Sequence, residues 1–167
     1  MEEVWGGAGL SVIDRIAVVQ NRFYDRIRHG DSAKVAEGPA TAQDFSMLAG
    51  HKYCLVTTYR RSGEGISTPV WFGVRDGRLY FRTWTDSVKV KRIRNDPRAR
   101  ITPCSTRGKP KGPTAEGTAR ILDPSENEDA ERAIQSNYGL GRRIYETPID
   151  AANASLVYVE VVPGPPS

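Results

Sequence analysis

Three β-rich runs joined by short polar turns dominate the middle of this 167-residue chain. Tyr53 to Tyr59 and Ile66 to Val74 are rich in β-branched and aromatic residues, which indicates two strands. Asp76-Gly77 then predicts a tight turn into a third strand over Arg78 to Thr83. Strands joined in this way form antiparallel hairpins, and Pro69 interrupts the second of them.

One helix follows these hairpins, and more strands follow the helix. The helix is predicted from about Asp86 to Asn95, and a second helix opens at a capping box of Ser125 with Glu128 and ends at Gly139. Three further strands are expected, at Ala99 to Cys104, Thr114 to Leu122 and Leu156 to Val162. The pattern favours a mainly β fold with flanking helices, built as a small antiparallel barrel. The absence of GxGxxG and GxxxxGK[ST] motifs argues against Rossmann and P-loop sites.

The first 40 residues predict an N-terminal extension. An apolar stripe from Ser11 to Ile27 indicates an amphipathic helix, and Arg28 to Ala40 is polar and carries glycine and proline, which is typical of a linker. Thr41 to Ala49 is expected to form a second short helix with Thr41 as its N-cap. We therefore predict a helical extension and linker over residues 1–40 and a barrel domain over residues 41–167.

The corner between the third strand and the following helix carries the residue types of an anion site. The strand ends at Thr83, and Ser87 and Lys89 fall in the first turn of the predicted helix. Free backbone N–H groups and the positive end of the helix dipole meet at a helix N-terminus. A hydroxyl and an ammonium placed there would complete a phosphate pocket, although Thr83 and Ser87 are also ordinary capping residues.

Positive charge is concentrated in one part of the chain. Ten Lys or Arg against two Asp give the window from Arg82 to Lys111 a charge of +8, whereas the whole chain carries +4. Such a window indicates an anionic ligand or a solvated basic helix face. A nucleic-acid-binding barrel is not favoured, because Trp84 is the sole aromatic residue in the window.

Other functional classes find little support in the sequence. Cys54 and Cys104 lie in strand-like runs without metal-ligand spacing, so both are expected to be buried thiols and no metal site is predicted. The N-terminus lacks the pattern of a signal peptide, and no apolar run reaches the roughly 18 residues of a membrane span. We expect a soluble, cytoplasmic protein with no membrane partner.

Five short motifs together resemble one superfamily. They are Ser67 to Phe72, Gly77 to Thr83, Ser87 to Lys89, Asn95 to Ala99 and Glu116 to Ala119. In this order and spacing they resemble the split-barrel flavin and deazaflavin proteins, which include pyridoxamine 5′-phosphate oxidase and the F-420-dependent oxidoreductases. The similarity extends over about Phe45 to Leu122. It implies a six-stranded antiparallel split β-barrel of the FMN-binding type that forms a homodimer.

The resemblance also implies a set of cofactor-binding residues. Ser87 and Lys89 would hold the cofactor phosphate, with Thr83 beside it. The backbone from Pro69 to Phe72, which includes Val70 and Trp71, would line the ring system, and Thr68 beside it belongs to the cofactor-binding set. The cofactor sites would lie at the subunit interface of the homodimer. Trp71 is equally well interpreted as a core or interface aromatic residue.

The chain departs from the pyridoxamine phosphate oxidases at two places. Val88 stands where these enzymes usually carry an arginine, and their substrate-binding motif is missing from Leu156 to Ser167. Oxidation of pyridoxamine phosphate is therefore not expected. Arg92 or Arg82 could replace the lost bidentate phosphate contact.

The spread of basic residues favours F-420 over FMN. F-420 extends beyond its phosphodiester into a polyglutamate tail, so its protein should carry positive charge beyond the phosphate pocket. The residues available for this are Lys91, Arg92, Arg107, Lys109 and Lys111. Glycines and prolines make the segment from Arg107 to Pro113 a loop able to lie over such a tail.

We predict an oxidoreductase that transfers a hydride between F-420 and an electron-poor small organic substrate, such as an enone or a quinone. An FMN-dependent oxidoreductase and a non-catalytic flavin- or deazaflavin-binding protein stay open as alternatives. No residue stands out as catalytic. His29 and His51 are expected at the surface, and Tyr59, Tyr138 or solvent stay open as proton donor.

Overall fold

A computed structural model describes residues 30–138 and 156–165 of the chain. The strands are β1 (Tyr53–Tyr59), β2 (Gly65–Trp71), β3 (Gly73–Arg75), β4 (Arg78–Trp84), β5 (Arg98–Cys104), β6 (Ala115–Ile121) and β7 (Leu156–Pro163). The helices are α2 (Lys34–Glu37), α3 (Val88–Asn95) and α4 (Asn127–Tyr138), with short 3-10 turns η1 (Gly30–Ser32), η2 (Ser46–Leu48) and η3 (Pro124–Glu126). The predicted N-terminal helix and Gly139 lie outside the described residues.

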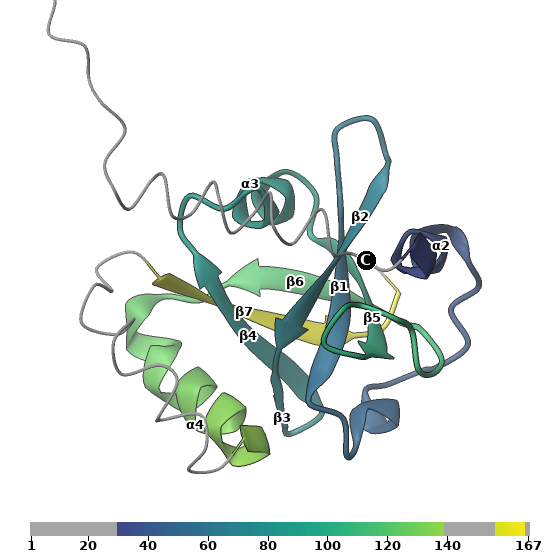
Figure 1. The fold of residues 1–167 in the computed structure, drawn as a ribbon. Helices are drawn as coiled ribbons and strands as arrows, with labels where there is room; N and C mark the ends of the chain where they lie inside the picture. The colour runs from purple at the N-terminus through teal and green to yellow at the C-terminus, as the bar shows by residue number, and fades with distance from the viewer. Residues whose placement is uncertain (1–29, 139–155, 166–167) are drawn as a thin grey trace, which may run out of the picture.

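The strands form one curled antiparallel sheet in the order β2-β1-β5-β6-β7-β4-β3 (Figure 1). This confirms the predicted mainly β split barrel with flanking helices, although the sheet has seven strands where six were expected. The predicted strand from Ile66 to Val74 is broken at Phe72. Its first part pairs with β1 and its second part pairs with β4. One nearly continuous segment therefore joins the two ends of the sheet order and curls the sheet into a barrel.

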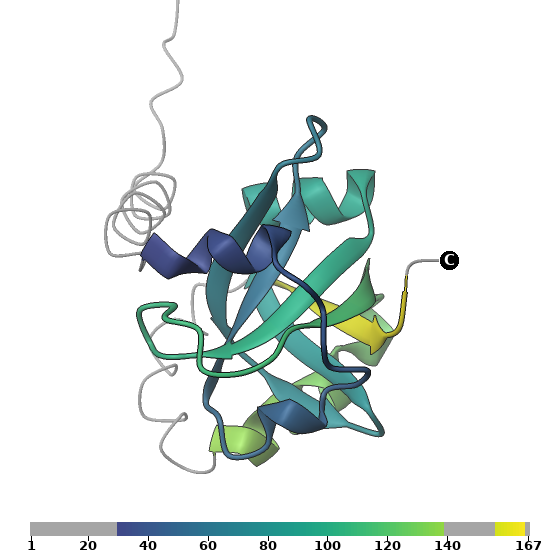
Figure 2. The same cartoon turned by 90° about the vertical axis from the view of Figure 1, so that its right-hand side faces the viewer.

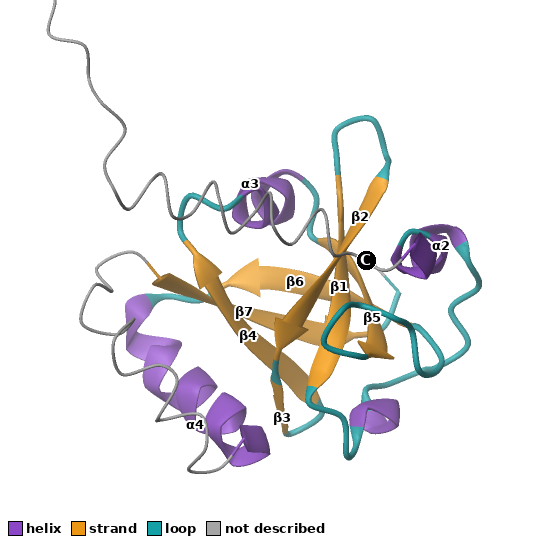
Figure 3. Cartoon of the chain, viewed as in Figure 1, coloured by secondary structure: helices purple, strands orange, loops and turns teal. Residues whose placement is uncertain are grey.

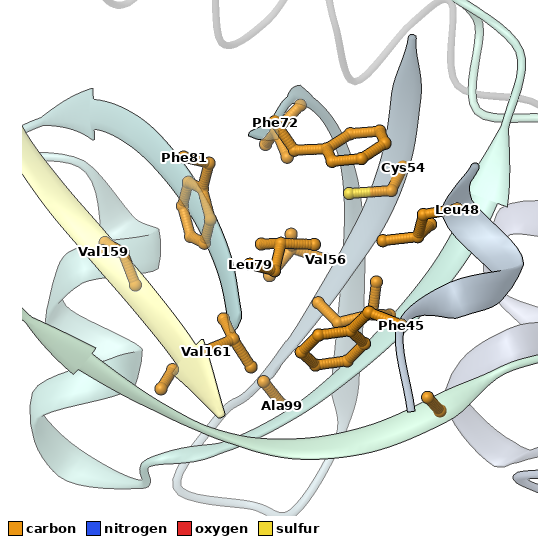
Figure 4. Close-up of a cluster of buried hydrophobic side chains, with 14 of the residues drawn as sticks. Phe45, Leu48, Cys54, Val56, Phe72, Leu79, Phe81, Ala99, Val159 and Val161 are labelled. Carbon is orange, nitrogen blue, oxygen red and sulfur yellow. The ribbon is translucent and has the colours of Figure 1, made fainter. Parts of the chain in front are cut away.

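Alternate residues of the strands fill the interior of the barrel. We call the face of the sheet that carries them the inner face, and the opposite one the outer face. Figure 4 shows the core side chains, among them Val56, Phe81 and Val161 from three different strands. Phe45 and Leu48, from the segment around η2, close the cluster and are each 2% exposed. Every strand except β3 thus contributes to one apolar core.

The helices lie outside the sheet (Figure 3). α4 packs on β3, β4 and β7, and α3 packs on β1 and β6. At the break between β2 and β3, the backbone of α4 touches the sheet directly. A Cβ on Gly73 would lie 2.0 Å from the carbonyl oxygen of Ala133, so this position admits glycine alone among the common residues. Contact with α4 therefore fixes where the segment turns from one side of the barrel to the other.

Three local predictions are wrong. Thr41 does not cap a helix, because its N–H donates to the carbonyl oxygen of Thr114 at 3.0 Å, and a single 3-10 turn replaces the helix predicted over Thr41 to Ala49. Two short helical segments lie within residues 30–38, where a linker was predicted. The helical region after β6 begins at Pro124 with Asp123 as its N-cap, two residues before the predicted N-cap Ser125, and the Glu126 carboxylate accepts from the Asp123 N–H at 3.1 Å.

The division of the chain at residue 40 stays a prediction. No helix within residues 30–138 and 156–165 combines the length and the apolar character needed to cross a membrane.

Candidate functional site

The corner between β4 and α3 brings two of the predicted site residues into contact. Ser87 is the N-cap of α3, and its Oγ accepts a hydrogen bond from the N–H of Val90 at 3.3 Å. Thr83 Oγ1 donates to the same Oγ at 3.3 Å. The helix thus begins at Val88, two residues later than predicted, because the serine hydroxyl satisfies one of its free N–H groups.

Lys89 reaches from α3 toward the inner face of the sheet. Its ammonium lies 5.6 Å from the centroid of the Phe81 ring. Its positive charge also lies close enough to affect the Cys54 thiol, and Cys54 belongs to the same core cluster as Phe81. Burial raises the pKa of the Cys54 thiol well above its ordinary value, and the nearby Lys89 cation partly opposes that rise. The structure therefore brings Thr83, Ser87 and Lys89 together at one end of the barrel interior.

The predicted residues of β2 divide between the two faces of the sheet. Thr68 pairs with Val56 and Val70 pairs with Cys54, so both side chains lie on the inner face. Pro69 pairs with Leu55 and lies on the outer face. Thr68 is half-buried, whereas Val70 is 8% exposed within the apolar core, so Thr68 is the one of these two side chains that a ligand at β2 could meet.

Trp71 lies on the outer face, in an aromatic cluster. Its ring stacks on Tyr138 at 4.9 Å between centroids and 22° between planes, and Tyr53 meets it edge-on at 6.2 Å. The Tyr138 hydroxyl accepts a hydrogen bond from the Phe72 N–H at 3.2 Å. These contacts favour the interpretation of Trp71 as a structural aromatic residue that ties the end of β2 to α4.

The two remaining predicted residues lie apart from each other. Arg92 is half-buried on α3, one turn after Ser87. Lys109 is exposed in the loop between β5 and β6, and its N–H donates to Ser105 Oγ at 3.1 Å. The neighbouring Gly108 is buried against the outer face, where a Cβ on it would lie 3.3 Å from the Leu55 side chain. Within one chain, this loop and Lys89 therefore lie on opposite faces of β1.

A charged network on the outer face was not predicted. Glu160 of β7 is 3% exposed. Its carboxylate accepts from Arg78 at 3.2 Å, from the Tyr80 hydroxyl at 2.9 Å and from Arg120 at 2.9 Å. Burial alone would raise the pKa of Glu160, but these three hydrogen bonds outweigh it and hold the pKa below its ordinary value. An acidic residue inside the apolar run of β7 was the available sequence signal.

The groups at the start of α3 fit a phosphate. A hydroxyl pair, a helix N-terminus and an ammonium are the donors that phosphate oxygens prefer. Thr58, also on the inner face of β1, is fully buried, and its Oγ1 has no hydrogen-bond partner among residues 30–138 and 156–165. Buried hydroxyls are normally satisfied, so this one is a further candidate ligand-binding group.

Comparisons with solved structures agree on the fold. A conserved hypothetical protein from Mycobacterium tuberculosis is 20% identical, with a TM-score of 0.57 over 77% of this chain and 87% of that one. A heme binding protein from Mycobacterium smegmatis is 15% identical, with a TM-score of 0.52 over 81% of this chain and 51% of that one. A FAD-binding protein from Mesorhizobium loti is 14% identical, with a TM-score of 0.50 over 71% of this chain and 83% of that one.

The search of curated proteins gives no match. The sequence model of the family described as pyridoxamine 5′-phosphate oxidase matches residues 40–162. That range contains strands β1 to β6, all but the last residue of β7, and the β4–α3 corner. This chain therefore belongs to the pyridoxamine 5′-phosphate oxidase family.

Proposed function

We propose that this protein is an oxidoreductase that transfers a hydride between the deazaflavin coenzyme F-420 and an electron-poor small organic substrate. The observation that carries the proposal is the grouping of Thr83, Ser87 and Lys89 at the N-terminus of α3. Membership of a family of flavin-type oxidoreductases supports the redox class. A bound deazaflavin would supply the hydride chemistry, and the protein would supply position and exclusion of water.

The chain's own residues have distinct parts in this proposal. Ser87, Thr83 and Lys89 bind the cofactor phosphate, with the α3 dipole adding to the attraction. The half-buried Thr68 lines the ring system from the inner face of β2, together with the backbone from Pro69 to Phe72. Lys91 and Arg92 extend positive charge along α3, beyond the phosphate. A homodimer with cofactor sites at its interface completes the proposed arrangement, and the substrate is a small molecule.

The position of Lys109 favours a second candidate, an FMN-dependent oxidoreductase or a flavin-binding protein without catalysis. FMN ends at its phosphate, so it needs the groups at the start of α3 and no further cations. Lys109 and its loop lie on the outer face, away from Lys89. This arrangement weakens the argument that the loop holds an acidic tail within the same chain.

A titration of the purified apoprotein separates these candidates. F-420 and FMN are each titrated against the wild type, Lys89→Met, and the double variant Lys109→Ala/Lys111→Ala, with cofactor fluorescence as the signal. Lys89→Met keeps the apolar stem over Phe81 and removes only the charge. Arg94→Ala is the matched control, because Arg94 is an exposed cation on the last turn of the same helix.

Tight F-420 binding that weakens in Lys89→Met but not in Arg94→Ala supports the proposal. Reduction of enones or quinones by the F-420 complex then tests the enzyme class directly. Preference for FMN moves the protein to the second candidate. Binding of neither cofactor contradicts both, and leaves Ser87 as a structural cap.

A further inference from the structure

Residues 30–38, which we call the strap, lie outside the part of the chain that matches the family. They contain η1 and α2, and α2 packs on β2 (Figures 1 and 2). Ser32 of the strap is fully buried. The family fold itself therefore does not account for this segment, which is nevertheless folded against the barrel.

One arginine anchors the strap. Arg100 lies on the outer face of β5, and its side chain is 13% exposed. Its Nη1 donates to three backbone carbonyl oxygens of the strap, those of Val35 at 3.1 Å, Ala36 at 3.1 Å and Gly38 at 2.6 Å. Its Nη2 donates to Glu116 at 3.2 Å, which holds the guanidinium in place. A cation at the C-terminal end of a helix satisfies the free carbonyl groups found there.

The anchored strap rests directly on the first residue of β2. A Cβ on Gly65 would lie 2.7 Å from the Ala36 Cβ and 3.0 Å from Thr57 Cγ2, so the strap touches the strand backbone at this point. Beneath it, Thr57 Oγ1 and Ser67 Oγ share a hydrogen bond of 2.8 Å across β1 and β2. The outer face of this hairpin is thus covered by the chain's own strap.

β2 is an edge strand, so contact with the strap on its outer face should help to hold it in place. It is bonded to β1 on one side and is the end of the sheet order. Edge strands are held by fewer hydrogen bonds than central strands and open more easily. β2 also carries four of the proposed cofactor-binding residues, Thr68 to Trp71.

We propose that the strap, anchored by Arg100, holds β2 in the position that cofactor binding requires, so that Arg100 is a positioning residue for the cofactor site. The cofactor role of Arg100 rests on the proposed function, whereas the contacts between Arg100 and the strap do not. A strand fixed before binding loses less conformational entropy when the cofactor binds. Release of the strap should therefore weaken cofactor binding without touching the phosphate pocket at α3.

The test compares Arg100→Ala with Arg98→Ala in the full-length chain. Arg98 lies on the same strand and the same face, but its guanidinium pairs with the nearby Asp96 at 2.7 Å and lies 4.6 Å from the centroid of the Tyr59 ring, whereas the strap carbonyls are bound by Arg100. Hydrogen–deuterium exchange is followed in the strap, in β2 and in α3, the last as an internal reference. The Kd of F-420 and of FMN is measured by fluorescence on the same samples.

We expect Arg100→Ala to speed exchange in the strap and β2 about tenfold or more, and to leave α3 as in the wild type. The Kd of the cofactor that the wild type binds should rise about tenfold, and Arg98→Ala should change neither quantity. If Arg100→Ala does not fold, Arg100→Lys replaces it, because lysine keeps the charge but loses the forked geometry. The same changes, reduced in size, are then expected.

Unchanged exchange in β2 would overturn the proposal. Faster exchange in β2 with an unchanged Kd would also overturn it, because the strap would then be structural only. A wild type that binds neither cofactor contradicts the proposed function, and with it the cofactor role of Arg100. The exchange data would still decide whether the strap holds β2.

Discussion

The charged residues at the two ends of strand β4 are arranged in different ways. At its start, Arg78 and Tyr80 donate to the buried Glu160, which also pairs with Arg120, so opposite charges balance within the sheet. At its end, Thr83 leads to Ser87 and Lys89, and Asp86 is the sole acidic residue between Thr83 and Asn95. The first arrangement is complete within the chain, which is typical of a stabilising network. The second is rich in donors and cations, which is typical of a site that receives an anion from outside.

The largest effect is expected from Glu160→Ala. Removing the carboxylate leaves two arginines without their shared partner, and we expect the free energy of unfolding to fall by about 3 kcal/mol. This is the low end of the range for buried pairs, because Arg78 and Arg120 are half exposed and can be rehydrated. Urea denaturation measures it.

Glu128→Ala is the control for that experiment. Glu128 pairs with Arg132 on the exposed side of α4, where such pairs contribute about 0.5 kcal/mol. Equal losses in the two variants would show that the Glu160 network stabilises no more than a surface ion pair.

Lys89→Met should lower the affinity for the cofactor and leave the stability of the fold almost unchanged. We expect the affinity for the phosphate-bearing cofactor to fall about tenfold or more, since hydrogen bonds to charged groups contribute about 1.5–3 kcal/mol. The free energy of unfolding should change by less than about 0.5 kcal/mol, as for most surface substitutions. Isothermal titration calorimetry and urea denaturation give the two numbers. A large loss of stability with unchanged affinity would show that Lys89, like Glu160, stabilises the fold and does not bind the cofactor.

Ser87→Ala should moderately lower both the stability of the fold and the affinity for the cofactor. Ser87 caps α3 and is also proposed to bind the phosphate. Loss of an N-cap costs about 1 kcal/mol of stability, and one lost hydrogen bond should weaken cofactor binding several-fold. Thermal denaturation with and without cofactor measures the two together. If the cofactor raised the Tm of Ser87→Ala by as much as that of the wild type, Ser87 would cap the helix without binding the phosphate.

The smallest expected effect is a pH dependence that arises at the start of β4. Hydrogen bonds hold the pKa of Glu160 below its ordinary value of 4.5. Its contribution to stability is therefore fully present above pH 4.5 and is lost as the pH falls through the lower pKa of the folded state. Glu160→Gln should show a weaker fall in stability below pH 4.5 in urea denaturation. An identical fall in the wild type and this variant would assign the acid sensitivity to other carboxylates.

The sequence predicted the parts of the molecule that depend on neighbouring residues. Thr83, Ser87 and Lys89 lie within one turn and one strand end, so their grouping follows from local geometry alone. The strand β1 was predicted with its observed limits, because its β-branched run is uninterrupted.

The errors have distant causes. The break at Phe72 depends on contact between Gly73 and Ala133, far apart in sequence. The capping box after β6 uses Asp123 and Glu126 in place of Ser125 and Glu128, and Arg120 supports it by binding Glu126 at 2.8 Å. The face on which Lys109 lies depends on Gly108, whose φ of 80° folds the loop back on the sheet. Of these three causes, the contact between Gly73 and Ala133 joins residues far apart in the chain, and no local pattern reports it.

The place of β7 has a consequence for the synthesis of the protein. It comes last along the chain among the strands of the described residues, yet it lies inside the sheet, between β6 and β4. While β1 to β6 are emerging from the ribosome, β4 and β6 each have an open edge that only β7 can cover. The two halves of the barrel are therefore separate hairpin systems until residue 163 has been made. Open strand edges attract other chains, so the nascent protein should depend on chaperones until its final strand is released.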